Sequence, residues 1–303
     1  MRLLGVNLGS YFRRVSQKNG IELVVSANRS FEESLRQAVA TPMPVTVPNS
    51  MPPRRGVPPP VMMQMTPLPM DPVGRVAAIS EEMQSAIEYF RSSWGDPPLK
   101  HIEVSPVTGR FGQGFSGMIY LPTLMYIDPA VVPVRADSPI DEAFMGQLLR
   151  THETAHQWWG NIVTTDSYHH EWLMESLANY SALMFLESRL GSRAVERALD
   201  VYRAELLAKG ADGATAESRG PIVEGRRLES SAAPGGADAV LYGKGTWIIH
   251  MLRRKLGDAN FRKMLAAVRQ EFRAHLTKFV RRDRLPFVTL PHRRQHFQKI
   301  GIA

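Results

Sequence analysis

The sequence predicts an α+β protein in which a small mixed β-sheet is followed by a lobe of helices. Strand-like runs of apolar and β-branched residues are confined to the first part of the chain, in residues 21–25, 102–107 and 118–121. Helical periodicity dominates afterwards, over residues 140–160, 171–189, 192–208, 243–256 and 259–275. Strands that precede helices, without regular alternation, indicate an α+β architecture.

Composition divides the chain into four predicted segments. Residues 1–41 are a partial N-terminal segment, and residues 42–78 are a linker or surface loop rich in proline and methionine. Residues 79–275 are the main domain, and residues 276–303 are a basic tail without assigned structure.

The N-terminal segment is expected to contain one or two strands and a short helix. Ile21-Glu22-Leu23-Val24-Val25 is the best strand candidate. Ser30 and Glu33 have the spacing of a capping box, so a helix is predicted over residues 31–39.

The second segment is dominated by proline. Eleven of the 22 prolines lie between Pro42 and Pro72, and proline favours extended or polyproline conformations because it lacks an amide donor. Six methionines in the same stretch are compatible with a docking surface, and a disordered linker is the simpler interpretation.

The main domain is predicted to begin with a helix over residues 79–93, whose Ala86, Ile87 and Phe90 face a core. Glycine-rich chain separates the strands at 102–107 and 118–121. A loop rich in glycine, alanine and serine is expected over 209–237.

The net charge of +8 does not indicate a nucleic-acid-binding protein. Residues 1–80 carry +5 and residues 273–303 carry +7, whereas residues 81–272 carry −4. A phosphate-binding domain should carry its positive charge on the folded body, so nucleic acid is not an expected partner.

Three classes of feature are not expected. The chain has no cysteine, which excludes disulfides and thiolate metal sites. No run approaches 18 apolar residues, and the apolar run from Leu3 to Val6 is too short for a secretory signal. No transmembrane helix is predicted, and a cytoplasmic location is the default expectation.

Five consecutive residues, His152-Glu153-Thr154-Ala155-His156, have the pattern of a metal site. On a helix, the two histidines lie on one face with about 5–6 Å between their Cβ atoms, so both can bind one zinc ion. Glu153 is rotated by about 100° from His152, so its carboxylate lies beside the metal and can accept a proton from a bound water. Glu175 is the candidate third ligand if a turn and a second helix return it to the metal.

Chance does not account for this pattern. A chain of this composition contains an H-E-x-x-H match by chance in roughly one case in fifty, before a later glutamate is required. The structural alternative is a pair of helix histidines that only hydrogen-bond at a surface.

The sequence from His152 to Asn161 resembles the HExxHxWxGN segment of the aminopeptidase N-type zinc metallopeptidases. Trp172-Leu173-Met174-Glu175-Ser176 is similar to the WLNEG segment of that family, and Tyr242-Gly243-Lys244-Gly245 is similar to its YxKG segment. The likeness covers residues 95–270 or so, and it identifies the chain as a truncated or divergent member.

The resemblance implies the roles of the site residues. His152, His156 and Glu175 would hold one zinc ion per chain, Glu153 would be the general base, and Tyr242 would donate a hydrogen bond to the oxyanion. It also implies a thermolysin-like catalytic domain in residues 79–275, with the zinc between the sheet and the helical lobe.

The chain departs from the family where the family has its GxMEN segment, whose glutamate binds the free amino group of the substrate. The corresponding region has no glutamate. Its candidate substrate-binding residues are Gly114, Phe115, Ser116, Gly117 and Met118. In the WLNEG segment, Met174 and Ser176 replace asparagine and glycine.

Two competing motifs are excluded. Gly112, Gly114 and Gly117 spell the dinucleotide fingerprint G-x-G-x-x-G, but a strand-like run ending at Pro122 follows them where that fingerprint requires a helix. No G-x-S-x-G segment is present, so a serine hydrolase has no candidate nucleophile.

The predicted function is therefore hydrolysis of peptide bonds by a zinc-dependent peptidase with a peptide as its partner. Two other classes stay open. One is a zinc-holding scaffold that binds peptides or proteins without catalysis, and the other is a protein that binds surfaces through its basic flanks. The oligomeric state is not predicted.

Overall fold

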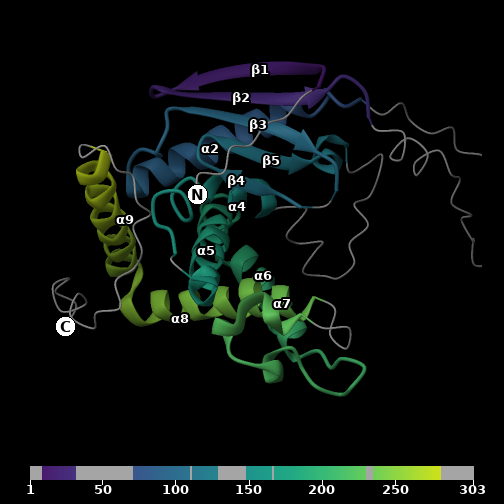
Figure 1. The fold of residues 1–303 in the computed structure, drawn as a ribbon, viewed down its shortest axis with the longest axis vertical. Coiled ribbons are helices and arrows are strands. Elements are labelled where there is room, and N and C mark those ends of the chain that lie inside the picture. The colour runs from purple at the N-terminus through teal and green to yellow at the C-terminus, as the bar shows by residue number, and fades with distance from the viewer. Residues whose placement is uncertain are drawn as a thin grey trace, which may run out of the picture.

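The computed structural model describes residues 9–31, 71–109, 111–128, 148–165, 167–229 and 235–280. The predicted α+β arrangement is confirmed: a five-stranded sheet lies beside a lobe of helices (Figure 1). Most of the helix expected over 31–39, most of the proline-rich segment and the tail from residue 281 lie outside the described residues.

The sheet begins with a hairpin of β1 (Tyr11–Lys18) and β2 (Ile21–Asn28). Asn19 and Gly20 connect the strands, and both have positive φ, at 52° and 76°. This is the backbone that a two-residue type I′ turn requires, and an Asn-Gly pair adopts it readily. β1 is mostly exposed, whereas β2 is buried along most of its length.

The strand order of the sheet is β1-β2-β3-β5-β4. β3 (His101–Val107) pairs in parallel with β2 and with β5 (Met118–Pro122), and β4 (Gln113–Phe115) adds an antiparallel edge. The predicted segment boundaries at 41 and 78 thus separate strands that share one sheet. The glycine-rich chain between the predicted strands contains β4, which carries too few side chains to show a strand pattern.

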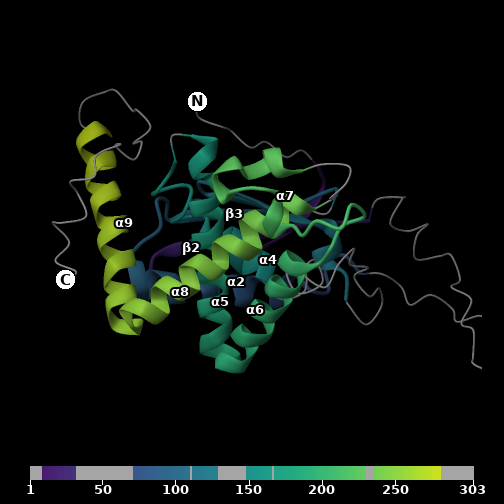
Figure 2. The same ribbon diagram turned by 90° about the horizontal axis from the view of Figure 1, so that it is seen from below.

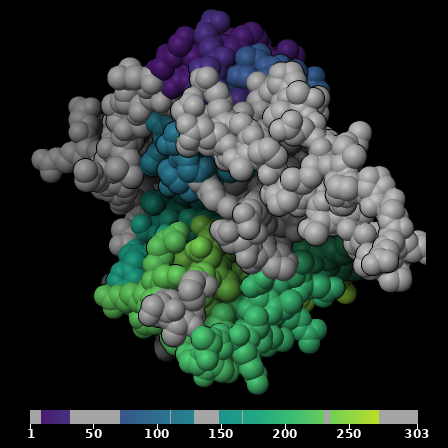
Figure 3. All heavy atoms as spheres, turned by 90° about the vertical axis from the view of Figure 1, so that its right-hand side faces the viewer, coloured from purple at the N-terminus to yellow at the C-terminus, as the bar shows by residue number. Residues whose placement is uncertain are grey.

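Helix α2 (Val76–Trp94) connects β2 to β3 and joins two hydrophobic cores. Its Ile79 and Ile87 pack against the sheet in a cluster with Leu23, Val104 and other strand residues. Phe90 and Trp94 belong to the core of the helical lobe. The view in Figure 3 shows the N-terminal strands and the green helices at opposite ends of the molecule.

The lobe is built around α5 (Glu171–Leu190), which follows a short 3-10 turn at Tyr168–His170 and whose residues from Ser176 to Leu186 are buried. Three helices pack against α5: α4 (Leu149–Ala155), α6 (Ser192–Leu207) and α8 (Gly245–Leu256). The last helix, α9 (Asp258–Val280), packs against α8 and α2 at one side of the lobe (Figure 2). The predicted helices at 171–189, 192–208, 243–256 and 259–275 therefore agree with the structure to within a few residues.

Two predicted boundaries differ from the structure. The helix expected to continue to residue 160 ends at Ala155, and in the turn that follows the ring of His156 bonds the carbonyl of Trp159. The loop expected over 209–237 contains 3-10 turns at Glu217–Arg219 and Ile222–Leu228, and α7 (Gly236–Asp238) begins near its end.

A further 3-10 turn, Thr123–Tyr126, follows β5. Within the part of the chain that the structure describes, no helix combines the length and apolar character needed to cross a membrane.

Candidate metal centre

The two motif histidines lie at the C-terminal end of α4, which is buried against its neighbours. His152 is 2% exposed and His156 is 7% exposed. His156 follows the last residue of α4 but keeps a helical backbone, and its amide donates to the carbonyl of His152 at 3.2 Å. The spacing of four residues therefore places both rings on one side, with centroids 4.6 Å apart.

The orientation of the His156 ring is fixed by a backbone group. Its Nδ1 lies 2.7 Å from the carbonyl oxygen of Trp159, to which it can donate only as an N–H. In the neutral ring, that leaves the lone pair on Nε2, the nitrogen that faces His152. Trp159 is held in turn by α5, because its indole N–H donates to the hydroxyl of Ser181 at 2.9 Å.

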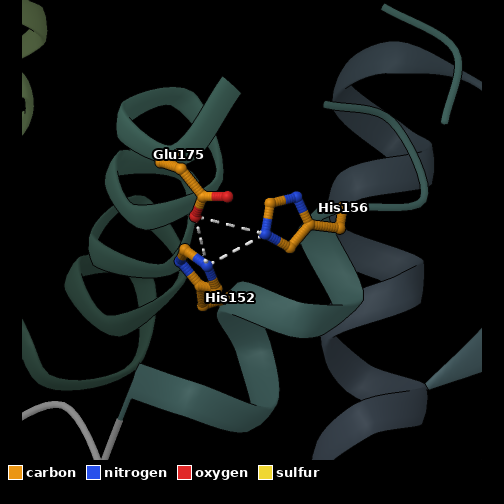
Figure 4. A group of neighbouring side chains, drawn as sticks. All are labelled: His152, His156 and Glu175. Atoms are coloured by element: carbon orange, nitrogen blue, oxygen red, sulfur yellow. Dashed lines mark hydrogen bonds and ion pairs between the residues drawn. The ribbon is translucent and has the colours of Figure 1, made fainter. Parts of the chain in front are cut away.

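Glu175 reaches the histidines from the second turn of α5 (Figure 4). Its Oε2 lies 3.3 Å from Nε2 of His152 and 3.6 Å from Nε2 of His156, and the two nitrogens are 3.0 Å apart. Among the described residues, these three form the only group with the spacing of metal ligands. The turn and second helix expected from the sequence do return Glu175 to the histidines.

The donor set and its dimensions fit a zinc ion. Ligand atoms at roughly 2.0–2.1 Å from a tetrahedral zinc are separated by about 3.3 Å. The three observed separations are 3.0, 3.3 and 3.6 Å, which bracket that value. Two imidazoles and one carboxylate are also a donor set typical of catalytic zinc, in which a fourth position is open to water.

The charges of the three residues are coupled. Burial, the largest single effect, disfavours the charged form of His156, but the charges of Glu175 and Glu153 and the hydrogen bonds to Glu175 and Trp159 together outweigh it and raise the pKa of His156 to about 9. Against its own burial, the attraction to His156 holds the pKa of Glu175 well below its usual range. Burial lowers the pKa of His152. In the metal-free site the Glu175 carboxylate and the neutral His152 ring are favoured, whereas His156 must release a proton before it can bind a cation, so metal binding there is coupled to proton release.

Glu153 lies beside the cluster in an almost dry environment. Its side chain is 4% exposed, and its Oε2 has no hydrogen-bond partner within the described part of the chain. Burial raises the pKa of Glu153 to about 8. A carboxyl group with a pKa near neutrality is suited to accept and return a proton at physiological pH.

The β4–β5 hairpin lies directly against α4 and the turn that follows it. The Gln157 side chain accepts from the amide of Gly117 at 2.9 Å and donates to the carbonyl of Phe115 at 2.8 Å. Asn161 donates to the carbonyl of Gly114 at 3.0 Å. These three bonds fix the hairpin in place. They also occupy the carbonyl groups of two candidate substrate-binding residues.

The five candidate substrate-binding residues are all in this hairpin. Gly114 and Phe115 end β4, Ser116 and Gly117 form the turn, and Met118 begins β5. Gly114 is the one that approaches the site most closely: a Cβ atom there would lie 2.6 Å from the carbonyl oxygen of Glu153 and 2.7 Å from Cβ of His156. A carboxylate side chain at position 114 would not fit.

We expect Gly114→Ala to destabilise the protein by about 1–3 kcal/mol, the usual cost of an overpacked buried site. The added methyl group would have to displace the backbone of α4 at Glu153, which cannot move aside as the end of a flexible side chain could. Gly243→Ala is the matched control, because a Cβ there meets only ordinary contacts at 3.6 Å or more. Denaturant unfolding measures both variants, and equal stability of the two would contradict the close approach at Gly114.

Tyr242 lies next to the histidines, in a π-helical segment (Ala239–Lys244) that precedes α8. Its ring centroid is 5.8 Å from that of His152, with the ring planes at 63°. Burial, followed by the charge of Glu175, raises the pKa of Tyr242 well above its usual value. The phenol is therefore protonated and can act as a donor. Single π turns within helices are often found at functional sites.

The serine that follows Glu175 has a structural explanation that the sequence alone did not supply. The Ser176 hydroxyl lies 2.5 Å from the carbonyl oxygen of Trp172 in its own helix and 3.2 Å from that of Leu241, so it is in contact with the segment that carries Tyr242. A Cβ at Gly245 would lie 1.8 Å from this hydroxyl, so glycine at 245 makes room for serine at 176.

Comparisons with known proteins agree with this geometry. Residues 115–281 match the domain of peptidase family M1. An aminopeptidase N from Lactococcus lactis subsp. lactis is 33% identical over 125 residues, which cover 40% of this chain and 14% of that protein. Endoplasmic reticulum aminopeptidase 2 from Bos taurus is 25% identical over 175 residues, which cover 58% of this chain and 17% of that protein.

The fold is also similar to that of solved structures. One is a variant of an M1 zinc metallopeptidase from Deinococcus radiodurans, with a TM-score of 0.50 and 19% sequence identity over 93% of this chain and 54% of that chain. At this identity the likeness shows the fold. The aligned part of this chain spans only 14% and 17% of the length of the two aminopeptidases above.

Proposed function

This chain belongs to peptidase family M1, and on that premise we propose that it is a zinc-dependent peptidase that hydrolyses peptide bonds with a metal-activated water. The observation that carries the proposal is the convergence of His152, His156 and Glu175 beside the buried carboxyl group of Glu153. A structural zinc site needs no adjacent proton acceptor, so the position of Glu153 favours an enzyme over a zinc-holding scaffold.

The three converging residues would hold one zinc ion per chain. Zinc bound there would act as a Lewis acid, lowering the pKa of a bound water and polarising the substrate carbonyl. Glu153 accepts the proton of the attacking water and returns it to the nitrogen of the departing amine. Burial raises the pKa of Glu153, so its carboxylate is a stronger proton acceptor than that of an exposed glutamate.

Tyr242 supplies the second catalytic group of the proposal. Its protonated hydroxyl donates a hydrogen bond to the carbonyl oxygen of the substrate as negative charge develops there. Its ring lies against His152, on the side of the cluster formed by α5 and the π-helical segment. The hydroxyl thus approaches the reacting carbonyl from the helical lobe, whereas Glu153 and the β4–β5 hairpin lie on the side of the sheet.

The experiment that tests the function joins metal analysis to turnover. We expect one zinc per purified chain after loading and dialysis, together with hydrolysis of an aminoacyl reporter or an internally quenched peptide. A chain that holds zinc but cleaves neither substrate would support the scaffold alternative. A chain that holds no zinc would refute the metal site itself.

Tyr242→Phe is expected to lower kcat by roughly 10²–10³-fold with little change in KM, since one oxyanion donor is lost and only the transition state needs it. The measurement is steady-state kinetics on the zinc-loaded protein. Tyr168→Phe, at an exposed tyrosine, is the matched control and should retain full activity. An unchanged kcat in Tyr242→Phe would assign the residue to packing.

We expect weak discrimination between peptides with a free and an N-acetylated amino terminus. The family anchors the substrate ammonium with a carboxylate in its edge strand, and losing such a partner costs about 2–5 kcal/mol, or roughly 30- to 4,000-fold in affinity. Here the segment from Gly114 to Tyr120 contains no carboxylate, and Gly114 itself has no space for a side chain. Turnover of one peptide with and without the acetyl group measures the effect, and a preference above about 100-fold for the free amine would show that another acid replaces the anchor.

A further inference from the structure

A cavity of about 210 Å³ lies between α2, α4 and α5, outside the residues of the metal centre. Three charged side chains line it, one from each helix: Glu82, Arg150 and Arg189. The large apolar side chains in its wall all come from α5, and they are Phe185, Leu186 and Leu190. The cavity therefore combines a few charged groups with an apolar surface, as sites for small molecules usually do.

The cavity is separate from the metal centre. On α4, Arg150 is rotated by about 200° from His152, so it lies on the side of the helix opposite the motif histidines. On α5, the lining begins at Ala182, which is about 10 Å further along the helix axis than Glu175. None of the residues that line the cavity has a part in the proposed hydrolysis.

The buried side chain of Arg150 has hydrogen-bond donors to spare. It is 7% exposed, and its Nε donates to Oε2 of Glu82 at 2.9 Å. Its Nη1 lies 3.3 Å from the sulfur of Met125, and a thioether is a weak acceptor. Among the residues that the structure describes, Nη2 has no hydrogen-bond partner. An anion would satisfy this guanidinium best, because charge-assisted hydrogen bonds are the strongest that it can make.

The charges around the cavity do not cancel. Arg150 and Arg189 contribute two positive charges and Glu82 contributes one negative charge, which leaves one positive charge in excess. Glu82 is already bonded to Arg150, whereas Arg189 forms no ion pair with any residue in the described ranges. Arg189 is exposed, and its Cζ lies 5.6 Å from the ring centroid of Phe185. The cavity thus favours an anion over a cation or a zwitterion.

The entrance and the apolar wall limit what this anion can be. Leu190 is 60% exposed and lines the cavity next to Arg189, so solvent reaches it there. Phe185 and Leu186 are 6% and 9% exposed, and they offer surface to an apolar body further inside. A cavity of about 150 Å³ can hold a benzene molecule, and drug-sized ligands need roughly 300 Å³ or more. The volume therefore suits one ring or a short branched chain with one acidic group.

We propose that this cavity is a binding site for a small organic carboxylate with a compact apolar body. The carboxylate accepts hydrogen bonds from Arg150, Arg189 adds positive charge at the entrance, and the apolar body lies against Phe185 and Leu186. The inference goes beyond the proposed peptidase function and does not rest on it. Because Arg150 belongs to α4, the ligand binds to the helix that carries the two motif histidines.

Binding of phenylacetate to the full chain tests the proposal. An NMR titration that observes the ligand should give a dissociation constant in the millimolar range, as expected for about ten non-hydrogen atoms. Phenylacetamide has the same size without the charge, and it should bind at least about tenfold more weakly. Phenylacetate that does not bind, or binds no better than its amide, would overturn the proposal. Tighter binding of free phenylalanine would show that the cavity takes a zwitterion and would overturn the assignment to a carboxylate anion.

Charge substitutions locate the bound phenylacetate. Arg189→Glu should weaken its binding by at least about tenfold, because a cation beside the carboxylate is replaced by an anion. Arg197→Glu is the matched control, since it makes the same change of charge at an exposed position on α6 and should leave the affinity unchanged. Equal affinities in the two variants would place the ligand elsewhere, for instance on the zinc ion, and would overturn the proposal.

Glu82→Gln should have the opposite effect. It removes the carboxylate that Arg150 now contacts, so phenylacetate should bind severalfold more tightly and raise the unfolding temperature more than it does in the wild type. Weaker binding in Glu82→Gln would contradict an anion site. If this variant does not fold, the comparison of Arg189→Glu with Arg197→Glu decides the question. Every readout here is binding, so a zinc-loaded chain without peptidase activity would refute the proposed function and leave this site in place.

Discussion

Glu153→Gln is expected to lower kcat/KM by roughly 10³–10⁴-fold, at the upper end of what general acid–base catalysis contributes. Glutamine has nearly the same shape as glutamate but cannot accept a proton from the attacking water. Because Glu153 is not one of the three converging ligands, the variant should still bind one zinc per chain. Kinetics with an internally quenched peptide, paired with metal analysis, measures both results.

Glu196→Gln is the matched control for this substitution, since Glu196 lies on the exposed face of α6. It should retain wild-type kinetics. If Glu153→Gln and Glu196→Gln had equal activity, Glu153 would have no part in proton transfer. A loss of zinc from Glu153→Gln would instead indicate that the carboxyl group supports the metal.

Glu175→Ala is expected to reduce zinc affinity by more than the roughly 10- to 100-fold that loss of an outer-shell partner costs, because a ligand itself is removed. The variant would leave His152 and His156 as the only remaining members of the cluster. Hydrolysis should fall in parallel, since the metal would be lost at ordinary concentrations. Titration of the metal-free protein with zinc, in competition with a chelator, gives the affinities.

A second readout for Glu175→Ala does not depend on turnover. A ligand that binds only the folded state stabilises it by about 2.7 kcal/mol at 100 times its Kd. Zinc should therefore raise the unfolding temperature of the wild type and of an Asp200→Ala control on α6, but not that of Glu175→Ala. An equal shift in all three proteins would place the zinc elsewhere.

The sequence could predict the elements whose information is local. The helices at 171–189 and 192–208 show apolar periodicity over many residues, and the structure has them with almost the same bounds. The two histidines were predictable as neighbours for the same reason, since four residues on a helix fix their relation. Glu175 could be named only as a conditional candidate, and the family resemblance strengthened it, because its distance from His156 carries no geometric information until the turn between them is known.

The contacts that the sequence could not predict are those between distant residues. The bonds from Gln157 and Asn161 to the β4–β5 hairpin span 40 to 47 residues, and amide side chains of this kind have no distinctive spacing. β4 has three residues with a glycine in the middle, so its only two side chains, Gln113 and Phe115, lie on one face and show no alternation. The Asn19-Gly20 turn was a readable hairpin signal between two strand-like runs, and it predicts the pairing of β1 with β2.

Helix α2 has a consequence for how the chain can be divided for expression. One side of it completes the apolar layer beneath the strands, and the other completes the aromatic core around Trp158. A fragment that begins after Trp94 would lack the helix that both halves share, and it would expose Trp158 and Phe185 to water. Sheet and lobe therefore form one cooperative unit, and a domain boundary drawn between them would cut through a common interior.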